Sequence, residues 1–149
     1  MPQTSKDAIE RFVNRGLLIR FDPGTVFGTA NAHFGVVVNS DPKSQQLVVV
    51  ICASSKVEKR INNAKARGMP SGTIVRINAR SHPHFSKDTV FDCNYAEKID
   101  FTVLAAWLAE SKIELPMYDD TLDEVLVDEI CAGIMISDMV APEIKDLLI

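Results

Sequence analysis

The sequence has no hydrophobic stretch of the length that a transmembrane helix requires. Its longest uninterrupted apolar runs, such as Leu47 to Ala53, fall far short of the roughly 18 residues needed to cross a bilayer. The first residues, MPQTSKDAIERF, are charged and lack the apolar region of a secretory signal. We therefore expect a cytoplasmic protein with no membrane partner.

Cysteine is scarce, and the three cysteines present lie far apart in the sequence. Cys52, Cys93 and Cys131 are odd in number and form no Cys-x-x-Cys pair. This count and spacing argue against a disulfide framework and against a zinc knuckle. The sequence therefore predicts reduced thiols.

The short motifs of the common enzyme classes are also missing. There is no GxxxxGKS/T phosphate loop, no GxGxxG, no HExxH and no GxSxG. No motif therefore indicates a nucleotide-driven enzyme or one of the common hydrolases. We expect no cofactor. His82 and His84 could offer two imidazoles to a metal, with Cys93 or Cys52 as a third ligand, but the spacing matches no strong zinc pattern. We interpret the pair as loop histidines and expect no metal site.

What remains is an ordinary globular composition. The chain has 149 residues, of which 46% are hydrophobic and 24% charged, which suffices for one core but not for two full-sized domains. We predict a single domain over residues 1–149. A helical pattern comes first, then five or six short strands to about Asn94, then two or three helices, and this order favours an α+β domain.

The predicted strands centre on a hairpin. HFGVVVN (33–39) and LVVVICA (47–53) are rich in β-branched residues and flank the polar segment SDPKSQQ. Because both runs are almost continuously apolar, we expect both of their faces to be covered. Weaker strand patterns cover 17–20, 25–27, 73–77 and 89–93.

Helices are expected at both ends of the chain and after the hairpin. The first begins at Thr4 or Ser5. The segment 57–64 forms either a turn or two of helix or part of a mobile excursion that ends at Gly68-Met69-Pro70. Asp100 can cap a helix that stops before Pro116. Of the last two helices, the first is expected to be capped by one of the residues 119–121, and the second to begin near Pro142.

Charge divides the chain into two regions of opposite sign. Residues 1–112 carry 15 Lys and Arg against 10 Asp and Glu, whereas residues 113–149 carry one base against 10 acids. The basic excess is concentrated between Lys56 and Lys87, where eight cations face the single acid Glu58. Such a stretch is either a solvated surface loop or a site for a polyanion such as nucleic acid.

The hairpin brings together residues that can act on a phosphodiester. His33 opens the first strand, and Ser54 and Ser55 end its antiparallel partner, so we expect them to lie close together. An imidazole can move a proton while hydroxyls orient a phosphate. The alternative is a histidine that merely opens a strand beside serines that begin a loop.

At this hairpin the sequence resembles the MazF/PemK family of toxin-antitoxin endoribonucleases. The resemblance lies in GTANAHFGVVVN and VVVICASS and extends more loosely through TIVRI and DTVFDCNYAEKID. Ser54 falls where the family keeps its catalytic or phosphate-contacting Thr, Ser55 where the next Ser stands, and His33 where the family has an Arg. His33-Phe34 replaces the family's Arg-Pro, so either His33 acts as a general acid and base or activity has been lost.

The resemblance implies a small SH3-like antiparallel β-barrel over 17–100. The N-terminal helix and the acidic helical extension over 101–149 are expected from the residue pattern, and the extension is additional to the minimal barrel of the family. The resemblance also implies a homodimer that cleaves single-stranded RNA without a metal and is inhibited by an antitoxin protein. His33, Ser54 and Ser55 would then be catalytic. Basic residues of the stretch would bind the RNA backbone, namely Lys56, Arg60, Arg76 and Arg80. The alternative is a non-catalytic interaction module, regulatory or in phage defence, with the same barrel.

Overall fold

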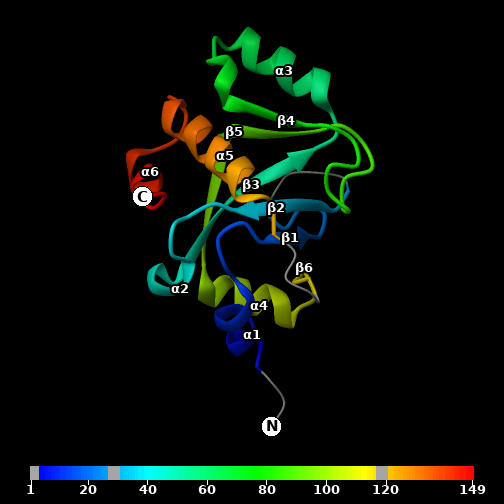
Figure 1. Cartoon of the computed structure of the whole chain (residues 1–149). Coiled ribbons are helices and arrows are strands. Elements are labelled where there is room, and N and C mark those ends of the chain that lie inside the picture. Colours follow the sequence, from blue (N-terminus) through cyan, green and yellow to red (C-terminus); the bar gives the residue numbers. More distant parts are fainter. Residues whose placement is uncertain (1–3, 27–30, 117–120) are drawn as a thin grey trace.

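The fold is built on one antiparallel sheet of six strands (Figure 1). The computed structural model describes residues 4–26, 31–116 and 121–149. The strands are β1 (Leu18–Phe21), β2 (His33–Val37), β3 (Leu47–Ser54), β4 (Ile74–Ile77), β5 (Thr89–Asp100) and β6 (Ile113–Glu114). Their order across the sheet is β4-β5-β3-β2-β1-β6, and each neighbouring pair is antiparallel.

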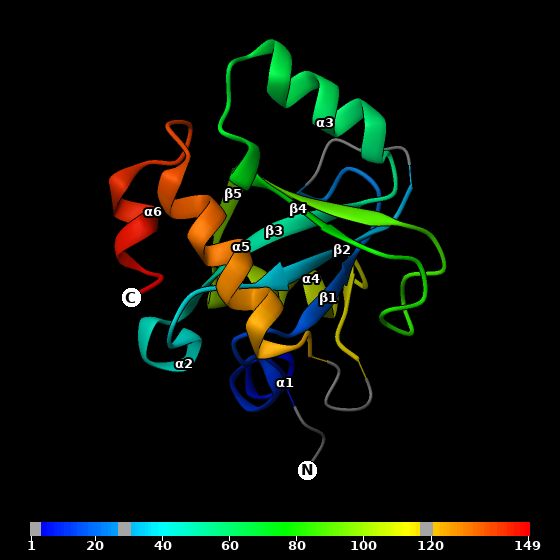
Figure 2. The ribbon, with the colours of Figure 1, turned by 45° about the horizontal axis from the view of Figure 1, so that its top comes forward.

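Helices cover both faces of this sheet (Figure 2). The helices of the described part are α1 (Ser5–Phe12), α2 (Pro42–Gln45), α3 (Val57–Ala66), the short 3-10 helix η1 (Ser71–Thr73), α4 (Phe101–Ala109), α5 (Glu124–Ile136) and α6 (Pro142–Asp146). Apolar side chains of α1 and α4 form a core with one face, and those of α5 form a second core with the other, against which α6 also packs. The continuous apolar runs of β2 and β3 are explained by this double burial, because each contributes valines to both cores.

The α+β class is confirmed, whereas the SH3-like barrel is not. β4 and β6 lie at opposite ends of the strand order, so the described sheet is open rather than closed. β5 also continues to Asp100, well past the predicted end near Asn94. Between the pairs Ile51–Ala96 and Ala53–Phe91 its register with β3 shifts, so β5 has extra residues there that form a bulge.

Several local predictions differ from the structure. The strand expected over 25–27 is not formed at Thr25 and Val26, which follow a turn, and residue 27 lies outside the described part. Asp123 caps α5, its carboxylate accepting the Val125 N–H, in place of the predicted cap at 119–121. Residues 119 and 120 lie outside the described part, and Thr121 forms a bridge with Leu17 instead.

The hairpin loop is held by a buried asparagine. The Asn39 side chain is fully buried, accepts the Val49 N–H at 2.9 Å and donates to the Leu47 carbonyl and the Gln45 side chain at 2.8 Å each. Gln45 belongs to α2, a turn of helix that the sequence did not predict, and it donates in turn to the Leu147 carbonyl. This network ties the hairpin tip to the end of the chain.

Two close contacts fix α5 on the sheet. Gly133 lies so near η1 and β5 that a Cβ atom there would meet the Gly72 carbonyl oxygen at 2.7 Å and the Cys93 sulfur at 2.8 Å. At the end of the helix the buried Ser137 hydroxyl donates to Asn94 at 2.7 Å. Asn94 in turn donates to Thr73 at 3.0 Å, so the helix end, β5 and η1 share one buried network.

None of the helices in the described part of the chain has the length and hydropathy needed to cross a lipid bilayer.

Candidate active site

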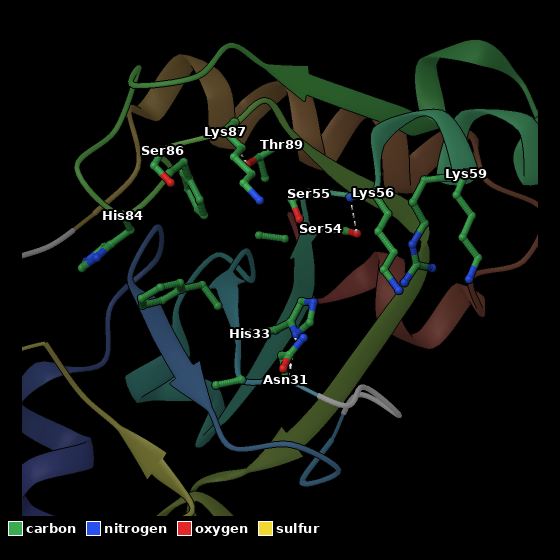
Figure 3. A pocket seen from close by; sticks show the side chains of 15 residues that line it. Asn31, His33, Ser54, Ser55, Lys56, Lys59, His84, Ser86, Lys87 and Thr89 are labelled. Atoms are coloured by element: carbon green, nitrogen blue, oxygen red, sulfur yellow. Dashed lines mark hydrogen bonds between the residues drawn. The ribbon is translucent and has the colours of Figure 1, made fainter.

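An open pocket of about 470 Å³ lies where β2 begins and β3 ends (Figure 3). The first turn of α3 forms one side of it, and the loop between β4 and β5 forms another. Strand ends and a loop meet here, so polar side chains face the pocket while the sheet beneath stays apolar. The lining residues are Asn31, Ala32, His33, Phe34, Ala53, Ser54, Ser55, Lys56, Lys59, Arg60, His84, Phe85, Ser86, Lys87 and Thr89.

The three residues predicted to be catalytic, His33, Ser54 and Ser55, all line this pocket. The reason lies in the strand register. Gly35 of β2 pairs with Cys52 of β3, and extending that register by two residues places His33 opposite Ser54. The antiparallel hairpin thus accounts for their proximity.

The orientation of His33 fixes the roles of its two ring nitrogens. Its Nδ1 lies 2.9 Å from the Asn31 carbonyl oxygen. A carbonyl oxygen can only accept a hydrogen bond, so Nδ1 carries the proton in the neutral ring and Nε2 keeps its lone pair. The neutral imidazole therefore offers an acceptor for a proton.

The serines mark the transition from β3 to α3. Ser54 is buried, and its Oγ accepts the Lys56 N–H at 3.2 Å, which turns the chain into the helix. Ser55 is exposed in the pocket. No side chain caps the N-terminus of α3 through a hydrogen bond in the described structure, so the positive end of this ten-residue helix adds to the attraction for an anion at the pocket.

Four cationic side chains line the pocket. Lys56 directly precedes α3, Lys59 and Arg60 belong to its first turn, and Lys87 comes from the β4–β5 loop. In Figure 3 the Lys87 side chain reaches down toward Ser55. Arg60 lies 4.0 Å from the Asp92 carboxylate, at the outer limit of an ion pair. The excess of positive charge makes the pocket suited to phosphate groups.

Two of the four predicted RNA-binding residues, Lys56 and Arg60, are in the lining, and two are not. Arg76 is on β4, where it forms an ion pair with Asp88 at 2.9 Å. The Arg76 guanidinium, together with a hydrogen bond that the Ala79 N–H donates, lowers the pKa of the Asp88 carboxyl below its usual value. Arg80 occupies the turn after β4 with a positive φ of 65°. Both lie outside the residues that line the pocket.

Sequence reasoning did not assign Lys59 or Lys87 to the site, and it considered His84 only as a metal ligand before interpreting it as a loop histidine. Lys59 follows Lys56 at a spacing of three, which places the two on one side of a helix, so this signal was present in the sequence. Lys87 and His84 reach the pocket only because the β4–β5 loop folds back over the strand ends. No local pattern predicts that path.

The histidines of the loop pack against aromatic rings. His84 stacks on Phe34 with ring centroids 4.4 Å apart and planes inclined by 27°, and the His82 ring lies 5.3 Å from that of His84. Of the two cysteines considered as a third metal ligand, Cys93 is buried in the core beneath α5. Across the described ranges, no group of three or more His, Cys, Asp or Glu side chains is placed to hold a metal ion.

Cys52 on β3 and Cys93 on β5 are poor nucleophiles. Burial raises the pKa of Cys52 and Cys93 to about 12 each, so little thiolate is present near neutral pH. We expect both to react with iodoacetamide at pH 8 roughly 100- to 1,000-fold more slowly in the folded protein than in urea. Mass spectrometry of the alkylated peptides measures this, and equal rates in both states would contradict the burial of these thiols.

Comparison of the sequence with protein-family models and with curated proteins yields no match. The chemistry of the site must therefore be argued from its own residues. These provide a proton acceptor, four hydroxyls and four cations around one open pocket.

Proposed function

We propose that the protein binds single-stranded RNA in this pocket and cleaves it without a metal, as an endoribonuclease. The observation that carries the proposal is the His33 ring, whose Nδ1 is held by a carbonyl so that Nε2 can accept a proton in a pocket lined by cations and hydroxyls. Proton transfer by a positioned histidine contributes typically about 100- to 10,000-fold to a rate.

The proposed reaction uses the RNA's own 2′-hydroxyl. His33 Nε2 takes the proton of that hydroxyl, and its oxygen attacks the adjacent phosphorus. The new bond between the 2′-oxygen and phosphorus forms as the bond between phosphorus and the 5′-oxygen breaks. The departing 5′-oxygen takes a proton from water, and the His33 imidazolium returns its proton to the solvent. The products are a 2′,3′-cyclic phosphate and a 5′-hydroxyl. Ser54 and Ser55 would contact the phosphate, and the lysines would stabilise its charge.

Backbone affinity would come from the cations of the pocket. We expect Lys56→Ala and Lys87→Ala each to weaken binding of a non-cleavable 2′-O-methyl RNA. Each should also reduce the slope of log affinity against log salt concentration by about 0.7, the value for one lost phosphate contact on a single strand. Fluorescence anisotropy between low and moderate salt measures both changes. Lys145→Ala, on α6, removes a cation away from the pocket lining and should change neither.

Kinship with the MazF/PemK family is part of this proposal. The resemblance at the β2–β3 hairpin supports it, and the homodimer and inhibition by an antitoxin come with it. On this proposal the protein is a cytoplasmic toxin of a toxin-antitoxin or phage-defence system. Arg76 and Arg80 would bind RNA that extends past the pocket.

A non-catalytic interaction module is the second candidate function. Two features favour it. A histidine stands where the family has its arginine, and α5 exposes apolar side chains among acidic ones, with Val125 68% and Ile136 50% exposed. Such a surface is suited to a protein contact.

The experiment that separates these functions incubates a mixed-sequence, end-labelled RNA with the purified protein in chelator and low salt. Cleavage supports the endoribonuclease. Retention of intact RNA that weakens with salt supports a binding module, and the absence of both cleavage and retention would overturn the RNA proposal in favour of protein partners.

A further inference from the structure

The pocket has two chemically different ends. Lys56 and Lys59, at the start of α3, lie at one end, and His84 of the β4–β5 loop lies at the other (Figure 3). The cationic end is explained by phosphate binding. The aromatic end has no role in the chemistry proposed for His33.

The aromatic end is a stack of rings anchored in the core. Phe34 is half-buried and meets His84 at 4.4 Å, close to parallel, while Phe85 contacts Phe34 edge-on at 6.1 Å. Phe85 is buried and contacts Phe91 of the core at 6.1 Å in the same edge-on way. The exposed His84 ring is therefore held by Phe34, which Phe85 supports, and by His82, whose ring centroid lies 5.3 Å from that of His84.

A flat ring at one end of a pocket and a cluster of cations at the other match the two halves of a nucleotide. Every base has a flat π face that stacks on an aromatic ring, and proteins that bind single strands combine such rings with a positive groove. A base in a duplex is already stacked and paired, so only an unpaired base is able to lie on the ring.

We propose that the Phe34–His84 pair is a stacking platform for one unpaired base of the RNA, and that it limits the pocket to single strands. This inference rests on the proposed function, since it concerns how the same pocket recognises its substrate. The phosphates would lie toward Lys56, Arg60 and Lys87, and the base would lie on the exposed imidazole.

The test compares two strands that have the same phosphates. One is a four-nucleotide 2′-O-methyl RNA, and the other is the same backbone with every base removed. We expect the unaltered protein to bind the strand with bases more tightly by a factor between about 5 and 150, the range for one stacked base. In His84→Ala this ratio should fall close to one, and in His84→Phe it should be retained. His84→Phe also shows that the loop tolerates a replacement.

Lys87→Ala provides the matched control from the same loop. It should weaken both strands equally and leave their ratio unchanged. An undiminished ratio in His84→Ala, with Lys87→Ala still weakening both strands, would overturn the platform and leave phosphate binding in the pocket intact. Failure of the unaltered protein to bind either strand would overturn the platform together with the proposed function.

Discussion

His33→Ala is expected to lower the rate of RNA cleavage by about 100- to 10,000-fold, the usual contribution of a positioned general base. The substitution removes the Nε2 lone pair that the Asn31 carbonyl keeps available in the neutral ring. His33 is half-buried at the start of β2, so its loss should leave the sheet in place. Single-turnover cleavage of a labelled RNA in chelator measures the effect.

His33→Asn is the matched control, because its side-chain nitrogen takes the place of the histidine Nδ1 that faces the Asn31 carbonyl. Its amide can still donate to the Asn31 carbonyl but cannot act as a base near neutral pH. We therefore expect it to be as inactive as His33→Ala while both variants bind 2′-O-methyl RNA within a few-fold of the unaltered protein. Undiminished cleavage by either variant would remove His33 from the mechanism.

Gly133→Val is expected to lower the free energy of unfolding by about 3 kcal/mol, the upper part of the usual range for overpacked cores. A Cβ atom at this position would meet the Gly72 carbonyl oxygen at 2.7 Å and the Cys93 sulfur at 2.8 Å. The first is backbone and the second is buried in the core, so neither can move away without shifting η1 or β5. Since small domains have only about 5–15 kcal/mol of stability, this loss is large.

Urea unfolding followed by circular dichroism measures this loss. Ala132→Val is the control because Ala132 is the exposed neighbour of Gly133 on the same helix. There we expect a loss below about 1 kcal/mol, which reflects only the lower helix propensity of valine. Equal stability of Gly133→Val and the unaltered protein would contradict the close approach of α5 to the sheet.

The central hairpin was predictable because its signals are local. The β-branched runs of β2 and β3 predict strands, the polar loop between them predicts a hairpin, and antiparallel pairing then places His33 near Ser54 and Ser55. The double burial of these strands was predictable for the same reason. Their side chains are apolar on both faces of the sheet, whereas strands with one face in water alternate apolar and polar residues.

The open sheet was not predictable because it depends on contacts between distant residues. β6 consists of Ile113 and Glu114, and its pairing with Phe21 and Arg20 of β1 leaves no pattern in so short a segment. The second half of β5 carries Glu97, Lys98 and Asp100 on exposed positions, so its sequence is too polar to indicate a strand. Pairing with the apolar β3 overrides that local preference.

The candidate site was predictable only in part, for the same physical reason. Residues on the two strands of the hairpin and on the helix directly after it could be placed from the sequence. Lys87 and His84 belong to the loop between β4 and β5, whose path depends on the positive φ of Arg80 and on the burial of Phe85. Neither feature is indicated by the surrounding residues.

The most direct test of the central claim is the chemistry of the RNA ends that the protein leaves. RNA is incubated with the protein in excess chelator, and mass spectrometry identifies the two ends at each cut. Attack by the 2′-hydroxyl with His33 as base predicts a 2′,3′-cyclic phosphate on one product and a 5′-hydroxyl on the other. Uncut RNA at stoichiometric protein, or products with a 3′-hydroxyl and a 5′-phosphate, would contradict the account.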